Sequence, residues 1–198
     1  MEILFATSNS HKVSEASEIF SRFGHAVSQL EISGKVPELT EPQADGIEEV
    51  ALSKMRQIRD LVRGTPIEKS AILVEDSGIF IQSLQGFPGP YSSFVERTIG
   101  LEGILALLQK DRDRVAEYRS AVVISLEGET MSSSGFCRGK ISEVISGDMG
   151  FGFDPIFIPE DGDGRTCGEM TSSEKSAISH RGRALKELSE LLFSRQSE

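Results

Sequence analysis

The stretch Ile72-Leu73-Val74-Glu75-Asp76-Ser77-Gly78-Ile79 places two adjacent carboxylates directly after a short apolar run. Such runs predict short strands, here over residues 71–74 and 79–81, and the polar tetrad between them predicts a turn. A carboxylate at the edge of a core is costly unless a cation compensates it, and its oxygens suit Mg²⁺. Ligands of α/β sheets also bind beyond strand ends. A turn that merely ends the strand and a magnesium site explain this stretch equally well.

Apolar runs alternate with amphipathic stretches on both sides of this tetrad, which predicts an α/β or α+β architecture. Strands are expected over residues 3–6, 26–30, 118–126 and 130–138, the last two joined in a hairpin at Glu127-Gly128-Glu129. Helices are expected over 11–23 with Ser10 as N-cap, 46–62, 101–110 and 174–193. The last helix has an apolar stripe of Ala177, Leu185, Leu188, Leu191 and Leu192, and in the second Val50, Lys54, Ile58 and Leu61 lie near helical spacing. Residues 34–43 and 86–90 are rich in turn formers and predict loops.

The composition is that of a globular protein, and we expect one domain over residues 1–198. Of the 198 residues, 38% are hydrophobic and 26% charged, and a chain of this size buries roughly 70% of its unfolded surface. The two cysteines, Cys137 and Cys167, have no metal-binding spacing and predict reduced thiols. No apolar run approaches the length of a membrane span, and the N-terminus lacks a signal-peptide pattern. These features predict a soluble, cytoplasmic protein with no membrane partner.

The formal net charge of −10 excludes one class of partner. Proteins that coat DNA or RNA neutralise many phosphates with Lys and Arg, so no nucleic acid polymer is expected. A small anionic ligand is still compatible with this charge, because a few cations and a bound Mg²⁺ reverse the potential inside one cleft.

The segment Thr7-Ser8-Asn9-Ser10-His11-Lys12 lies between a predicted strand and a predicted helix. Free backbone N–H groups and the positive end of a helix dipole attract phosphate there. Taken alone, the segment fits an ordinary capped helix with a solvated lysine better than a phosphate site. Neither familiar glycine-rich phosphate loop occurs in the chain.

Three further segments allow two interpretations each. Phe151-Gly152-Phe153-Asp154 is irregular, and its aromatic rings suit either stacking on a nucleobase or a place in the core. Lys175, His180 and Arg181 present donors for a purine carbonyl or for phosphate, or form a solvated helix face. Glu48 and Glu49 either complement a helix dipole, or one of them completes a Mg²⁺ site with Glu75 and Asp76.

Five motifs in order along the chain resemble those of the inosine/xanthosine triphosphate pyrophosphatases, which remove deaminated purine nucleotides. They are Thr7-x-Asn9-x-x-Lys12, Glu75-Asp76-Ser77-Gly78, Gly86-x-Pro88-Gly89-x-Tyr91-Ser92, Phe151-Gly152-Phe153-Asp154-Pro155 and Glu174-Lys175-Ser176-Ala177-Ile178-Ser179-His180-Arg181-Gly182. The resemblance spans nearly the whole chain. It implies an elongated α/β fold with a mixed central sheet flanked by helices, an active-site cleft between two lobes, and a homodimer.

The resemblance also assigns roles to residues. It implies Mg²⁺-dependent hydrolysis of ITP, dITP and XTP to the monophosphate and pyrophosphate, with Asp76 as metal ligand and proton acceptor. The metal ligands would be Glu49, Glu75 and Asp76. Substrate would contact Thr7, Ser8, Asn9, Ser10, His11, Lys12, Ser77, Phe151, Gly152, Phe153, Asp154, Lys175, His180 and Arg181.

Two departures from the family pattern affect these roles. Val50 stands where the family has Asn after the helix Glu, and Ser93-Phe94 replaces the Ala-Arg that often follows Tyr91-Ser92. Two rival functions are a pyrophosphatase for modified pyrimidine triphosphates and a nucleotide sensor without catalysis. The first would lack the Ser-His-Arg helix, and the second would have a damaged carboxylate pair.

Overall fold

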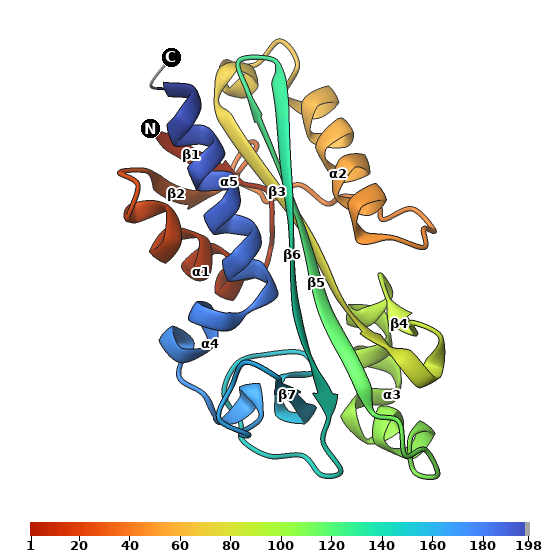
Figure 1. Cartoon of the computed structure of the whole chain (residues 1–198). Coiled ribbons are helices and arrows are strands. Elements are labelled where there is room, and N and C mark those ends of the chain that lie inside the picture. Colours follow the sequence, from red (N-terminus) through yellow and green to blue (C-terminus); the bar gives the residue numbers. More distant parts are fainter. Residues whose placement is uncertain (197–198) are drawn as a thin grey trace.

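The computed structural model describes residues 1–196, which form a mixed seven-stranded sheet in the order β2-β1-β3-β5-β6-β7, with β4 paired to β3 (Figure 1). β1 pairs in parallel with β2 and β3, and the remaining pairs are antiparallel. The α/β fold with a mixed sheet is therefore confirmed. The strands are β1 (Glu2–Phe5), β2 (Ala26–Gln29), β3 (Ala71–Ile81), β4 (Pro88–Gly89), β5 (Val115–Leu126), β6 (Glu129–Ile141) and β7 (Phe157–Pro159).

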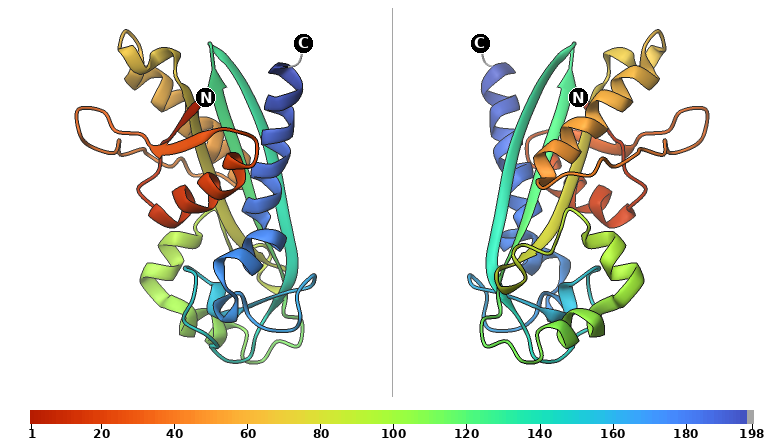
Figure 2. Two further views of the ribbon diagram at one scale, coloured as in Figure 1. Left: turned by 90° about the vertical axis from the view of Figure 1, so that its left-hand side faces the viewer. Right: turned by 90° about the vertical axis from the view of Figure 1, so that its right-hand side faces the viewer.

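Helices pack on both faces of this sheet (Figure 2). They are α1 (Ser10–Ser21), α2 (Ile47–Val62), α3 (Ser92–Leu107), α4 (Ser172–Ile178) and α5 (His180–Gln196). α1 and α5 enclose one core cluster that includes Phe5, Phe20 and Leu188, and α2 encloses a second on the opposite face with Ile72 and Val123. No helix within residues 1–196 combines the length and the apolarity that crossing a membrane requires.

The β5–β6 hairpin runs almost the whole length of the molecule and makes it elongated (Figure 1). Its two-residue turn consists of Glu127 and Gly128, which both have positive φ, at 52° and 87°. Turns of this kind match the right-handed twist of the flanking strands. The predicted hairpin is confirmed, although each strand is longer than the sequence pattern indicated.

The predicted turn at Glu75-Asp76-Ser77-Gly78 is wrong. β3 continues through the tetrad, and these residues pair in register with residues 119–122 of β5. The polar residues interrupt the apolar pattern, but pairing with the long strand β5 continues through all four positions and keeps the segment extended. Gly78 is required in this strand because a Cβ there would lie 2.1 Å from the carbonyl oxygen of Gly89 in β4.

Three helix boundaries also differ from the predictions. Asn9 rather than Ser10 caps α1, because its side chain accepts hydrogen bonds from the backbone N–H groups of His11 and Lys12. α3 begins at Ser92, nine residues earlier than expected, and contains a break at Gly100, where φ is 66°. The closing helix is two helices, separated at Ser179, whose ψ of 154° is extended.

The predicted apolar stripes are confirmed only in part. Leu185, Leu188 and Leu192 of α5 are buried, whereas Ala177 and Leu191 are exposed. On α2, Leu61 is exposed and Val62 is buried in its place. The error at Ala177 follows from the break at Ser179, which places residue 177 on a different helix from the leucines of α5.

The half of the sheet that includes β7 has a third core cluster on the face shared with α5. It contains Ile79, Ile104, Phe153 and Phe157. On the other face α2 begins near the middle of the sheet and runs away from this half, where Val115, Phe136 and Arg138 are exposed. The expected division into two lobes stays a prediction.

Candidate active site

A cavity of about 730 Å³ lies at an unpaired stretch of β3. Within the described chain, β1 pairs with β3 only as far as Leu73, and β4 begins to pair at Ile79. The edge of β3 between these two pairings therefore faces the cavity, and side chains from both faces of the strand line it. The wall includes most predicted site residues: Thr7, Ser8, Asn9, Lys12, Glu75, Asp76, Ser77, Phe151, Gly152, Phe153, Asp154, Lys175, His180 and Arg181.

Three predicted site residues do not line this cavity. Ser10 lies in the first turn of α1 and is exposed, and His11 stacks on Phe151 with 5.5 Å between ring centroids. Glu49 is exposed on α2, and the structure does not bring it together with Glu75 and Asp76. The backbone of residues 7–9, the cap of α1 and Lys12 remain as the phosphate-type end of the cavity.

Glu75 and Asp76 project to opposite faces of the sheet, because consecutive side chains alternate along a strand. Glu75 faces α1 and α5: its Oε1 accepts hydrogen bonds from Ser120 Oγ at 2.8 Å and Arg181 Nε at 3.0 Å. Its Oε2 lies 2.5 Å from Lys12 Nζ. Burial by itself raises the pKa of Glu75, but the charges of Arg181 and Lys12 outweigh it and hold the pKa well below its usual range. Glu75 is therefore a permanently ionised anchor for two cations.

Asp76 faces α2, where the buried Lys54 donates a hydrogen bond of 2.6 Å to its Oδ1. Its Oδ2 is buried and has no hydrogen-bond partner. Burial raises the pKa of Asp76 to about 6, against the lowering effect of Lys54 and Lys12. A carboxylate with a free oxygen and a pKa near neutrality is suited to accept a proton.

Arg181 is fully buried and links the helices to β3. Its guanidinium donates to Glu75, to Glu15 of α1 at 2.7 Å and to Ser77 Oγ at 3.0 Å. α5 brings Arg181 this close because it rests directly on Gly135 of β6, where a Cβ would lie 2.2 Å from the carbonyl oxygen of His180. The predicted donor cluster is thus an internal ion-pair network rather than a solvated helix face.

Aromatic rings and Lys175 form the other end of the cavity. Lys175 Nζ donates to Asp154 Oδ2 at 2.6 Å and lies 4.5 Å from the ring centroid of Phe151. Phe151 is partly exposed, whereas Phe153 is buried in the core cluster next to β7. Of the predicted pair, Phe151 is therefore the ring with exposed surface, and His11 and Lys175 both lie against it.

His180 stacks in parallel on Tyr118, with 4.5 Å between ring centroids, and both rings line the cavity. Burial lowers the pKa of His180 well below its usual value, so the imidazole is neutral at pH 7. Its Nε2 is buried without a hydrogen-bond partner. A neutral imidazole with an unpaired nitrogen is suited to one specific hydrogen bond with a ligand.

Several wall residues were not predicted as site residues. Lys54 had a signal, since it is a charged residue at an apolar position of α2 between Val50 and Ile58. Glu38 and Glu41 lie in the irregular segment before α2, which folds over the cavity without a pattern in the sequence. Tyr118 resembles any other aromatic residue of a strand, so nothing in the sequence distinguishes it.

The carboxylates of the wall outnumber its cations. Six line the cavity (Glu38, Glu41, Glu75, Asp76, Glu96 and Asp154) against four cations (Lys12, Lys54, Lys175 and Arg181). Among residues 1–196, no group of three or more His, Cys, Asp or Glu side chains is arranged to hold a metal by itself. The oxygen-rich wall and the unpartnered Oδ2 of Asp76 nevertheless fit a hard cation such as Mg²⁺, which completes its shell with water and phosphate oxygens.

Comparison with known proteins gives consistent matches over nearly the full chain. A model described as the Ham1 family matches residues 3–191. Proteins named dITP/XTP pyrophosphatase from Thermococcus kodakarensis and Pyrococcus horikoshii are 45% and 44% identical over 192 residues, covering 97% of each chain in both cases. The solved structure of a HAM1 protein from Coxiella burnetii has a TM-score of 0.82 and 28% identity, and covers 98% of this chain and 99% of its own.

Proposed function

The chain belongs to the Ham1 family, and we propose that it hydrolyses deaminated purine nucleoside triphosphates (ITP, dITP and XTP) to the monophosphate and pyrophosphate. Its relatives of about 45% identity are named dITP/XTP pyrophosphatases. The observation that carries the proposal is the cavity itself. It has a helix N-terminus and Lys12 at one end, an aromatic ring and a lysine at the other, and Asp76 between them.

We propose Mg²⁺ as the cofactor. A triphosphate carries several negative charges, and the excess of carboxylates in the wall would repel it unless a cation bound with it. Asp76 is the first candidate ligand, and Glu38 and Glu41 of the wall replace the exposed Glu49 as supporting carboxylates. When bound, Mg²⁺ neutralises phosphate charge and stabilises the pyrophosphate leaving group.

In the proposed reaction, a water oxygen forms a bond to the α-phosphorus of the nucleotide. The bond from that phosphorus to the oxygen bridging to the β-phosphorus breaks, and the electron pair leaves with pyrophosphate. Asp76 accepts the proton of the attacking water. Lys12 and the backbone N–H groups of residues 7–9 bind phosphate oxygens, and Glu75 supports them by holding Lys12 and Arg181 in place.

Base selection follows from hydrogen-bond complementarity. Hypoxanthine and xanthine have a carbonyl at position 6, which accepts a hydrogen bond from Lys175 or His180, while the ring stacks on Phe151. Adenine presents an amino donor at this position and leaves a buried donor unpaired, which costs about 1–3 kcal/mol. Recognition of the carbonyl at position 6 favours a purine substrate over the modified pyrimidine triphosphates of the rival enzyme class.

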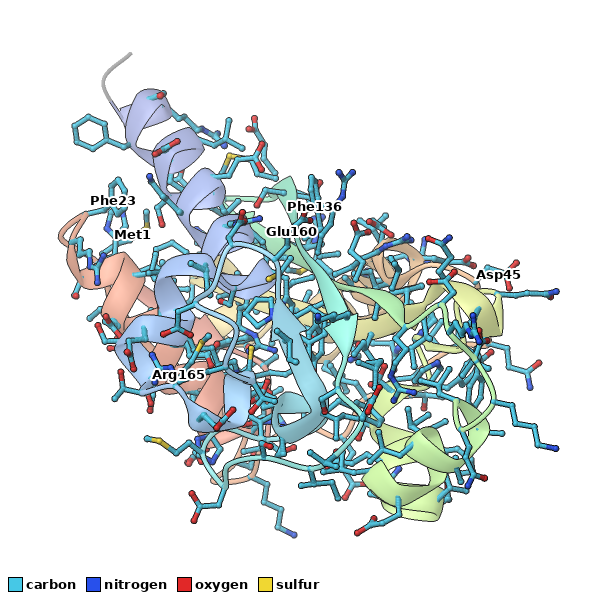
Figure 3. The ribbon with its side chains drawn as sticks, turned by 60° about the horizontal axis from the view of Figure 1, so that its bottom comes forward. Met1, Phe23, Asp45, Phe136, Glu160 and Arg165 are labelled. Carbon is cyan, nitrogen blue, oxygen red and sulfur yellow. The ribbon has the colours of Figure 1, made fainter. Side chains whose placement is uncertain are left out.

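We also propose a homodimer that forms through the uncovered half of the sheet. A groove of about 1440 Å³ lies there, and its wall includes Phe80, Phe87, Tyr91 and Val115. Acidic residues (Asp45, Glu117 and Glu160) and basic residues (Arg119, Arg138 and Lys140) both line it, so neither sign of charge dominates the surface and a second copy would not be repelled (Asp45, Phe136 and Glu160 are labelled in Figure 3).

The experiment that tests the proposed reaction is identification of its products. With ITP and Mg²⁺, the protein should release pyrophosphate and no orthophosphate, and in ¹⁸O-labelled water the label should enter the monophosphate. Asp76→Asn should lower the rate by at least about 100-fold. Orthophosphate as the product, or full activity of Asp76→Asn, would overturn the proposal.

A further inference from the structure

Tyr118 of β5 and His180, the first residue of α5, form a ring stack in the wall of the cavity. The two rings are parallel within 4°, with 4.5 Å between their centroids. A Cβ at Gly152 would lie 4.0 Å from Tyr118 Oη, so the stack lies at the aromatic end of the cavity. A tilt of the imidazole about its Cβ–Cγ bond would drive one of its edges into the phenol ring. The stack therefore fixes the plane of the His180 ring.

Tyr118 is itself held from several sides. Its ring makes an edge contact with Phe157, with 4.8 Å between the centroids and 75° between the planes. The side chain is buried in the core cluster next to β7. Its backbone is paired on both sides, with Ile79 of β3 and with Cys137 of β6. Tyr118 thus gives the imidazole of His180 a fixed support.

His180 differs from its cationic neighbours because its buried Nε2 has no hydrogen-bond partner within residues 1–196. Lys175 and Arg181 already donate to carboxylates, at 2.6 Å to Asp154 and at 3.0 Å to Glu75. Burial and the charge of Arg181 lower the pKa of His180 well below its usual value and keep the imidazole neutral. In a neutral imidazole, Nε2 is a single directed donor or acceptor, so the hydrogen bond that it makes depends on the orientation of the ring.

We propose, on the basis of the proposed function, that Tyr118 is a positioning residue that holds the imidazole of His180 in the plane from which Nε2 hydrogen-bonds to position 6 of a purine. His180 touches the base, and Tyr118 acts through it. Tyr118 projects to the face of the sheet opposite to Asp76, because it pairs with Ile79, three positions after Asp76 on β3. Discrimination between 6-keto and 6-amino purines therefore depends on Tyr118, whereas the environment of Asp76 does not.

The test compares kcat/KM for ITP and for ATP in variants of Tyr118. Tyr118→Leu removes the stack and should lower the ITP-to-ATP ratio of kcat/KM about tenfold, mainly through loss of ITP hydrolysis. Tyr118→Phe keeps the ring and should keep the ratio within about twofold of the wild type. Phe23→Leu, a similar change at a half-buried ring that lines neither the cavity nor the groove, should leave both kcat/KM values unchanged.

Nitrogen magnetic resonance of labelled His180 separates positioning from general damage to the fold. When the product IMP is added, the Nε2 resonance should shift in the wild type and in Tyr118→Phe, because the nitrogen gains a partner, and should shift little in Tyr118→Leu. If Tyr118→Leu does not fold, Tyr118→Met, which also lacks a ring, carries the same expectations. A folded variant without the ring that keeps either the wild-type ratio or the wild-type shift would overturn the inference.

His180→Ala separates this inference from the proposed function. In the His180→Ala background, Tyr118→Leu should change the ITP-to-ATP ratio no further. If His180→Ala loses the preference for ITP while Tyr118→Leu keeps it, only the role of Tyr118 is wrong. If His180→Ala keeps the preference, other groups read the base, and the inference fails while the proposed function stands. If the wild-type protein does not prefer ITP to ATP, the proposed function fails and the inference fails with it.

Discussion

Glu75 and Asp76 are neighbours in the sequence, but the strand that carries them gives them different environments. Glu75 faces two cations and remains ionised, whereas Asp76 faces one lysine and keeps an unpaired oxygen. The sequence predicted a polar pair that acts together on one metal. The alternation of side chains along β3 separates the two roles, and only the structure shows that the turn between the strands does not exist.

The raised pKa of Asp76 predicts the pH dependence of catalysis. Because burial raises this pKa to about 6, the carboxyl group is protonated below that pH and cannot act as a base. We expect kcat/KM, which reports on the free enzyme, to fall as the pH decreases through about 6. A pH profile with ITP checks this; an acidic limb near the usual pKa of an aspartate would contradict it.

We expect Lys175 to contribute to the base preference. Lys175→Met removes the ammonium beside Phe151 and Asp154 and should lower kcat/KM for ITP by about 10-fold or more, with a smaller effect on residual ATP turnover.

Lys186→Met, at an exposed position of α5, is the matched control and should change neither substrate. An equal loss for ITP and ATP would place base recognition elsewhere. Arg181 is less suitable for this test, because its removal also takes one of the two cations from Glu75 and the nearer of the two from Glu15.

At the scale of elements, the site depends on how closely α5 lies on β6. The first turn of α5 carries His180 and Arg181, and it is positioned by Gly135 beneath it. The sequence indicated a single helix over 174–193. The break at Ser179 has no glycine or proline to signal it. It separates the helix that carries Lys175 from the helix that carries Arg181, and both side chains lie over the ring of Phe151.

Gly135→Ala should therefore displace His180 and Arg181, although Gly135 does not line the cavity. The added methyl group would meet backbone atoms of His180 and Ala184, which cannot move without displacing α5. We expect a loss of about 1–3 kcal/mol in the free energy of unfolding, together with reduced kcat/KM for ITP. Denaturant unfolding and ITP assays measure both. Ser132→Ala, at an exposed position of the same strand, should change neither the free energy of unfolding nor kcat/KM. If Gly135→Ala leaves both quantities at their wild-type values, α5 does not depend on close packing against Gly135.

At the scale of the molecule, the sequence predicted the architecture better than the boundaries. The α/β class, the long hairpin and five of the seven strands follow from periodicity that the folded sheet preserves. The short strands β4 and β7 leave no periodic signal. Lys12, Asp76 and Arg181 were predicted from motifs, whereas Glu38, Glu41 and Tyr118 reach the cavity through tertiary contacts that no local pattern encodes.

The uncovered half of the sheet predicts the oligomeric state. If the groove beside Val115 joins two copies, Val115→Asp should bury a charge there and shift the protein from dimer to monomer in light scattering at micromolar concentration. Leu107→Asp changes an apolar residue that is equally exposed but does not line the groove, and it should leave the dimer intact. A wild-type protein that is monomeric at these concentrations would contradict the dimer.

We propose that one cavity joins triphosphate hydrolysis to recognition of the 6-keto purine. The most direct measurement compares pyrophosphate release with Mg²⁺ from ITP, dITP and XTP beside ATP, GTP and CTP. We expect kcat/KM values for the first three to be at least about 10-fold above those for ATP and CTP. Equal values across all six nucleotides would contradict it.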